Sequence, residues 1–219
     1  PPMVEFKAYA DRIIKERWGI EVEHIRCRNT YQDVFYRRKS TMAKKNPGQI
    51  RGWPMRGGPG GAWCQGDVKL PALREINKRR DRNVMYLGIA ADEPDRTHIL
   101  SDKKKSPLVE AGWTEADCRR WCEENDLLSP IYTTATRGGC WFCHNQSVGQ
   151  LRLLRRDYPE LWALLLKWDA DSPVTFHSDG HTVHDFDRRF QMEDEGLIYP
   201  DDKIFRWDML DKELNYRWF

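Results

Sequence analysis

Val84-Met-Tyr-Leu-Gly-Ile-Ala90 is an uninterrupted, largely apolar run with the length of one β-strand. Such a run is typical of a strand that is buried on both faces of a parallel sheet. Asp92-Glu-Pro-Asp-Arg96 follows closely, and open α/β sheets bind their ligands beyond the carboxyl ends of the strands. The sequence therefore predicts a buried parallel strand with a candidate ligand loop at its end.

Helical and strand patterns alternate on both sides of this run. Ile20 to Ile25 alternates apolar and polar residues and predicts a second strand, and Val174 to Val183 predicts a hairpin around Asp179-Gly180. Apolar spacing, capping residues and first-turn prolines predict helices over residues 3–18, 31–38, 71–80, 114–125, 148–156, 157–168 and 185–194. We therefore predict an α/β fold, with a parallel sheet flanked by helices and a mostly helical C-terminal part.

The composition is that of a folded protein in water. The 219 residues are 40% hydrophobic and 32% charged, with a mean hydropathy of -0.79 and ten tryptophans. No apolar run has the roughly 18 residues of a membrane span, and no signal-peptide pattern opens the chain, so we expect a cytoplasmic protein that binds no membrane. The net charge is only +2, so bulk charge does not favour a nucleic-acid partner.

Clustered cysteines are the strongest chemical signal. Cys140-Trp-Phe-Cys143, preceded by two glycines, can chelate one metal ion or cluster from a single loop, although two small buried thiols would give the same pattern. A four-ligand site needs two further thiols, and spacing alone leaves Cys64, Cys118 and Cys122 open. Cys118 and Cys122 share one helix face as i and i+4. Cys27 ends a strand pattern and is expected in the core.

Basic and histidine-rich segments are weaker signals. Residues 39–62 form a long basic loop rich in glycine and proline, which suggests function. Basic stretches also occur at 37–39, 78–80, 103–105 and 155–156, and they would bind a phosphate backbone if they converged on one face. His177, His181 and His184 have no acidic or cysteine partner at ligand spacing, so we expect a polar hairpin there and not a second metal site.

Five segments carry a resemblance to a known family. They run from Ala62 to Leu73, Tyr86 to Arg96, Ser106 to Asp117, Gly139 to Ser147 and Leu151 to Trp162. The first is similar to a Trp-Cys-Thr-x-x-Leu-Lys motif, the second to Gly-Ile-Ala-x-Asp-Glu-Pro-x-Arg, and the fourth to Cys-Trp-x-Cys-Pro-x-Gln-Ser. These motifs, in this order, are found in the phosphoadenosine phosphosulfate (PAPS) reductase-like family, in its phage and bacterial branch.

The resemblance implies an adenine-nucleotide α-hydrolase-like fold. Residues 1–168 would form the PAPS reductase-like domain with a four-cysteine metal site, and residues 169–219 a C-terminal extension packed on the same domain. The family's Ser-Gly-Gly-x-Asp-Ser phosphate loop has no counterpart here, and Pro1 to Glu5 resembles the segment after the family's second strand. We therefore expect an N-terminally incomplete chain or half of a split protein. A partner chain or a second copy would then supply the missing strands.

The resemblance also implies the ligands of a metal centre. The family's recurring cysteines align with Cys64, Cys122, Cys140 and Cys143, whereas Cys118 has no counterpart. Related enzymes hold a 4Fe-4S cluster with four cysteines, so we expect that cluster here, with zinc as the alternative. Trp63 stands where adenylylsulfate reductases carry a second cysteine, which excludes a close relationship with those enzymes.

The resemblance marks Lys69, Gly88 and Arg96 as substrate-binding residues for ATP, PAPS or another adenine nucleotide. Ala90 stands where sulfonucleotide reductases usually carry a basic residue, and no cysteine follows Cys143. The thiol nucleophile of those enzymes is therefore missing, and no catalytic residue is assigned.

Three functions remain open from the sequence. The first is a PAPS reductase-like adenine-nucleotide enzyme of sulfur metabolism, served by a thiol electron donor or a sulfur donor. The second is ATP-dependent sulfur insertion into tRNA or DNA with an iron-sulfur cluster, in which the basic loop would contact the polymer. The third is a non-catalytic, metal-stabilised module.

Overall fold

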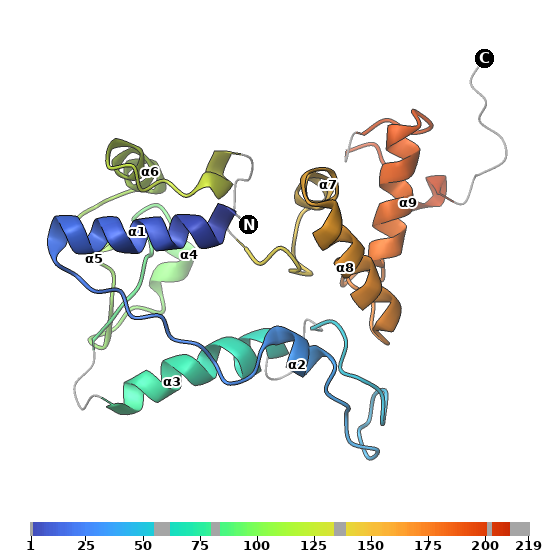
Figure 1. The fold of residues 1–219 in the computed structure, drawn as a ribbon, viewed down its shortest axis with the longest axis horizontal. Helices are drawn as coiled ribbons and strands as arrows, with labels where there is room; N and C mark the ends of the chain where they lie inside the picture. The colour runs from blue at the N-terminus through green and yellow to red at the C-terminus, as the bar shows by residue number, and fades with distance from the viewer. Residues whose placement is uncertain (1, 55–61, 80–83, 134–138, 201–202, 211–219) are drawn as a thin grey trace. The chain divides into compact units, whose positions relative to one another are not determined.

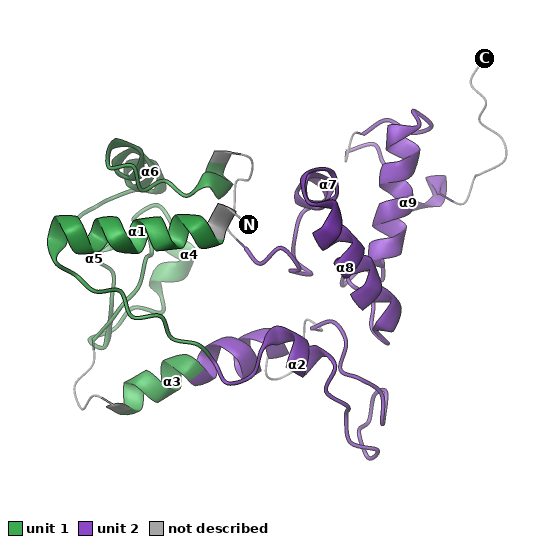
Figure 2. Cartoon of the chain, viewed as in Figure 1, with its two compact units in different colours: residues 1–26, 72–138 green, residues 27–71, 139–219 purple. Residues whose placement is uncertain are grey.

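The computed structural model describes residues 2–54, 62–79, 84–133, 139–200 and 203–210 (Figure 1). About half of the chain is helical, and the described residues contain one two-stranded parallel sheet. The chain forms two compact units (Figure 2). Unit 1 comprises residues 1–26 and 72–138, and unit 2 comprises residues 27–71 and 139–219. The domain boundary predicted after residue 168 falls within a helix of unit 2.

Unit 1 combines the parallel strand pair with short helices. Its elements are α1 (Pro2–Trp18), most of α3 (Leu70–Arg79), β1 (Met85–Tyr86), α4 (Pro94–Thr97), β2 (Lys104–Lys105), α5 (Pro107–Glu110), α6 (Glu115–Glu124) and the 3-10 helix η2 (Pro130–Thr133). The predicted N-terminal helix is confirmed. Gly19 ends it with a φ of 67°, which favours glycine. The predicted cap is also confirmed, because Thr114 and Asp117 form a reciprocal capping box on α6.

The strand predicted over residues 20–25 is wrong. This segment has no regular secondary structure, and Ile20 is 57% exposed. Alternation of apolar and polar residues specifies which face of a strand is apolar, but a strand forms only where a neighbour supplies its hydrogen bonds. Among the described residues no strand pairs with this segment.

The strand predicted over residues 84–90 is parallel but shorter and less buried than expected. Met85 pairs with Lys104 and Tyr86 with Lys105. Tyr86 is 67% exposed, whereas Ile89 and Ala90 are buried. The prediction of burial is therefore right only for the end of the run, where the Ser106 hydroxyl donates to the Ile89 carbonyl at 2.7 Å.

Unit 2 is built around an aromatic core. Its elements are α2 (Tyr31–Phe35), the π-helix η1 (Cys64–Lys69), the start of α3, α7 (Val148–Asp157), α8 (Pro159–Asp171), α9 (Val183–Asp194) and the 3-10 helix η3 (Trp207–Met209). Helices α7, α8 and α9 pack on one another (Figure 1). They bury a set of large side chains that includes Phe35, Trp53, Trp162, Leu165, Trp168, Phe176, Phe186 and Phe190.

The three helices predicted over this C-terminal part are confirmed. Ser147 caps α7 and Pro159 opens α8, as the sequence predicts. The hairpin predicted over residues 174–183 is a single tight turn without strands, in which the His177 amide donates to the His181 carbonyl at 2.9 Å. Of the long loop predicted over residues 39–62, the structure describes residues 39–54 and 62, and residues 55–61 lie outside the described part of the chain.

In the described part of the chain, no helix combines the length and the apolar character needed to cross a membrane.

Candidate metal centre

Cys140 and Cys143 lie on one tight turn that Gln146 holds in place. The Cys143 amide donates to the Cys140 carbonyl at 3.0 Å, which closes the turn. The Gln146 side-chain amide donates to the Cys140 carbonyl at 2.8 Å and to the Trp141 carbonyl at 2.9 Å. Sequence reasoning missed this role of Gln146. A long side-chain amide directly before the Ser147 cap, within reach of the carbonyls of the turn, is the signal that could have indicated it.

Cys64 lies in the same unit as Cys140 and Cys143 but comes from a segment far away in the sequence. It is the first residue of η1, which packs against α2. Burial raises the pKa of the Cys64 thiol; the Lys69 ammonium group opposes this rise, and negative charge on Cys143 and Cys140 adds to it. The three half-buried thiols lie in one part of unit 2, because the Tyr31 ring packs against both Trp63, which precedes Cys64, and Phe142, which lies between Cys140 and Cys143.

Aromatic rings next to the three cysteines in sequence pack on one another in unit 2. The Tyr31 ring lies 4.8 Å from the Trp63 ring and 4.2 Å from the Phe142 ring, between centroids. Trp168 stacks on Trp141 at 5.5 Å. Burial, reinforced by negative charge on Cys64, Cys143 and Cys140, raises the pKa of the Tyr31 hydroxyl far above its ordinary value. The hydroxyl therefore stays protonated at neutral pH and can act as a hydrogen-bond donor.

Several buried polar atoms in this region have no partner. The Tyr31 hydroxyl, the Trp63 and Trp168 indole N–H groups and the Gln146 side-chain oxygen are buried without a hydrogen bond in the described part of the chain. Each such atom costs about 1–3 kcal/mol when it stays unsatisfied. Three of the four are donors, which is the set that would suit thiolate or sulfide acceptors. The residues present therefore fit a group of negatively charged sulfur atoms.

The fourth predicted ligand, Cys122, belongs to the other unit. It lies on α6 in unit 1, one helical turn after Cys118. Burial raises the pKa of Cys122, with negative charge on Cys118 as the second cause. Within the described ranges, no three Cys, His, Asp or Glu side chains stand together at metal-ligand geometry. Cys64, Cys140 and Cys143 are thus neighbours and not a formed ligand set, and Cys27 instead donates to the Asp67 carbonyl at 3.4 Å.

The unpartnered indole of Trp168 gives a stability prediction. In metal-free protein, both Trp168→Phe and Trp53→Phe should lower the free energy of unfolding. The loss should be smaller for Trp168→Phe, by about 1.5–3 kcal/mol. Both rings are at least 95% buried, but only the Trp53 N–H has a partner, Asp169 Oδ1 at 3.0 Å. Urea unfolding of the two variants under chelating, reducing conditions measures the difference. Equal losses would contradict the unpartnered state of Trp168.

The predicted substrate residues are also divided between the units. Gly88 and Arg96 lie in unit 1 and Lys69 lies in unit 2, at the end of η1. The loop after β1 is held by Glu93, whose carboxylate accepts from the Ala90 amide at 3.1 Å and pairs with Arg96 at 2.6 Å. The Arg96 side chain is still 55% exposed, so more than half of the side-chain surface is accessible to a ligand.

The histidines predicted to form a polar hairpin each face a carboxylate. His184 Nδ1 lies 2.8 Å from Asp169, while His177 and His181 lie 3.8 and 3.9 Å from Asp179 and Asp185. His181 also stacks on Trp207 with ring centroids 3.7 Å apart. The three histidine side chains therefore take part in ion-pair and ring contacts within unit 2.

Comparison of the chain with protein-family models, with curated proteins and with solved structures gives no match.

Proposed function

We propose that this chain is a PAPS reductase-like adenine-nucleotide enzyme of sulfur metabolism whose cysteines hold a metal centre. The observation that carries the proposal is the packing of Tyr31 against both Trp63 and Phe142, which brings the segments of Cys64, Cys140 and Cys143 into one aromatic cluster. These thiols come from two of the segments that resemble the family, and buried donors without partners lie in the same shell. The adenine-nucleotide α-hydrolase-like fold belongs to the same proposal, which the parallel strand pair supports.

Cys64, Cys140 and Cys143, with Cys122 as the fourth, would hold the centre. A 4Fe-4S cluster would supply electron transfer or sulfur chemistry, whereas zinc would act as a structural clamp. The protein's own contribution is the low-polarity aromatic shell, the Tyr31, Trp63 and Trp168 donors, and the positive charge of Lys69, which opposes the rise that burial causes in the pKa of Cys64. These groups would stabilise negative charge on sulfur.

Nucleotide binding belongs to the loop after β1. Gly88 lies in the β1-loop segment with space around its Cα, since a Cβ there would meet no atom within 4 Å. Arg96 offers a guanidinium for bidentate contact with phosphate or sulfate. Its pairing with Glu93 is an exposed ion pair, and such pairs contribute about 0–1 kcal/mol, so an anionic ligand can compete for it.

Arg96→Ala should weaken binding of ATP or PAPS by about tenfold or more, which corresponds to about 1.4 kcal/mol. The matched control is Arg119→Ala, because Arg119 is also 55% exposed and also paired with a carboxylate, Glu123 at 2.9 Å. Isothermal titration calorimetry on the full chain measures both. A chain that binds no adenine nucleotide, or equal effects of the two variants, would count against the proposal.

A further inference from the structure

Positive charge is concentrated in one stretch of the sequence. No acidic residue occurs between Asp33 and Asp67, while the stretch holds seven of the 36 basic residues: Arg37, Arg38, Lys39, Lys44, Lys45, Arg51 and Arg56. The other 29 basic residues share the chain with all 34 acidic residues. The small net charge of the whole protein therefore hides a strongly basic segment in an otherwise acidic chain.

Most of this stretch folds into an arm, which we name the basic hairpin (residues 36–52). Arg38 bridges Ile50 in antiparallel fashion, and the Lys39 amide donates to the Gln49 carbonyl at 2.8 Å. The Arg51 amide donates to the Arg37 carbonyl at 3.0 Å, which extends the pairing toward the core. The predicted loop is therefore paired along its stem in the part that the structure describes.

The hairpin is anchored in unit 2 at its base. Phe35 and Trp53, which flank it, are fully buried. Gly52 has a φ of 67°, and a Cβ there would collide with Ser172 and the Pro173 ring. Farther out, the Asn46 side chain donates to the Pro173 carbonyl at 3.3 Å. Because the arm is anchored before a ligand binds, the arm loses less conformational entropy on binding than a free loop would.

The cations of the hairpin are largely uncompensated. Arg37, Arg38, Lys44 and Lys45 are exposed, and none of them forms an ion pair with a carboxylate in the described part of the chain. The Arg38 guanidinium donates to the Gly48 carbonyl at 3.0 Å and Lys39 to the Lys45 carbonyl, which satisfy hydrogen bonds but not charge. Only Arg51 is paired, with Asp67.

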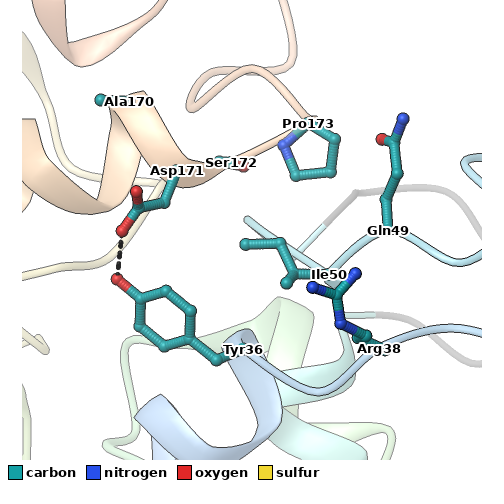
Figure 3. Close-up of a pocket in the computed structure, with 8 residues that line it drawn as sticks. All are labelled: Tyr36, Arg38, Gln49, Ile50, Ala170, Asp171, Ser172 and Pro173. Carbon is teal, nitrogen blue, oxygen red and sulfur yellow. Dashed lines mark hydrogen bonds between the residues drawn. The ribbon is translucent and has the colours of Figure 1, made fainter.

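A shallow hollow of about 530 Å³ lies at the base of the hairpin (Figure 3). Arg38, Gln49 and Ile50 line it from the hairpin, and Asp171 lines it from α8. The Asp171 carboxylate accepts from the Tyr36 hydroxyl at 2.6 Å and pairs with Lys167 at 3.0 Å. Because a carboxylate sits inside the hollow, a phosphate group is favoured on the exposed arm and not in the hollow.

We propose that the basic hairpin binds the phosphate backbone of a polynucleotide. Its cations lie spread along an exposed arm and do not converge on one pocket, so they suit a repeating chain of phosphates and not a single anion. Contacts of this kind are independent of base sequence and strongly salt-dependent. The inference goes beyond the proposed metal centre and does not depend on it.

The triple variant Arg37→Gln, Lys44→Gln, Lys45→Gln tests the proposal, because these side chains make no hydrogen bond that supports the hairpin in the described part of the chain. Fluorescence anisotropy on the full chain uses labelled single-stranded RNA and double-stranded DNA of about 20 nucleotides or base pairs. Wild-type protein should bind at least one. The variant should bind it about 10- to 100-fold more weakly at 0.1 M salt, with a salt slope smaller by about two to three. The better polymer identifies the source of the phosphates.

The matched control is Lys103→Gln, Lys104→Gln, Lys105→Gln, which removes the same charge from an exposed stretch of unit 1. It should bind like wild type. Circular dichroism checks that both triple variants are folded. The proposal is overturned if wild type binds neither polymer, if the two triple variants lose affinity equally, or if binding is seen only with vesicles of anionic phospholipid.

Discussion

Asp169→Ala is expected to lower the free energy of unfolding by about 3–5 kcal/mol. The Asp169 side chain is only 3% exposed and lies at the centre of unit 2. Its Oδ1 accepts from the Trp53 indole at 3.0 Å, and its Oδ2 accepts from the Val183 amide at 2.9 Å. The His184 ring, through Nδ1, and the His184 amide approach the same Oδ2. One carboxylate therefore joins α8, the first turn of α9 and the base of the hairpin.

The size of the effect follows from what the substitution leaves behind. Buried donors that lose their acceptor each cost about 1–3 kcal/mol, and the first turn of α9 also loses a negative charge that complements its dipole. Urea unfolding followed by circular dichroism gives the value.

Asp171→Ala is the control for this prediction. Asp171 lies two residues later on α8, also with two partners, but its side chain is 37% exposed. The control should cost no more than about 1 kcal/mol. A loss in Asp169→Ala within about 1 kcal/mol of this control would show that the carboxylate is not the junction described.

The parts of the fold that the sequence predicted depend on local chemistry. Thr114 with Asp117 is a cap that the residues within one helical turn complete, so the pattern predicts it without knowledge of the rest of the chain. The same is true of Pro159 at the first turn of α8 and of Gly19 at the end of α1. These elements need no distant partner to be specified.

The parts that could not be predicted depend on distant partners. The pairing of residues 37–51 was hidden by glycine and proline, and it is anchored by contacts of Gly52 with Ser172 and Pro173, far along the chain. In the sequence Asp169 has the pattern of an ordinary helix residue, and only the structure shows that its carboxylate accepts from the distant Trp53 indole. The alternation of residues 20–25 failed for the converse reason, because a strand pattern does not supply the neighbour that a strand needs.

The candidate centre shows both situations. Spacing placed Cys140 and Cys143 on one turn, and the structure closes that turn with a 3.0 Å backbone bond. Spacing could not bring Cys64 to them, since the two segments are separated by most of unit 1 in sequence. The assignment of Cys122, and not Cys118, as the fourth ligand stays a prediction. Both thiols lie on α6 in unit 1, so their place in the fold does not distinguish them.

Substitution of Cys64, Cys140 or Cys143 by serine is expected to reduce bound metal from about one centre per chain to less than about a tenth of that. A serine hydroxyl does not ionise at neutral pH and cannot replace a thiolate in a four-thiolate site. Metal analysis and visible absorption of anaerobically purified protein give the content. About four irons per chain with a broad band near 400 nm would indicate a cluster, and one colourless zinc would indicate a structural clamp.

Cys118→Ser and Cys122→Ser form the decisive pair, because the two thiols share one helix and lie one turn apart, and burial raises the pKa of both. If Cys122 is the fourth ligand, its variant should lose the metal while Cys118→Ser keeps it. The opposite result would move the fourth ligand to Cys118, and retention by both would leave a three-thiol site within unit 2. Metal that survives the loss of Cys64, Cys140 and Cys143 would remove the metal centre from the proposal, because no other thiol is placed beside the unpartnered Tyr31, Trp63 and Trp168 donors in the described part of the chain.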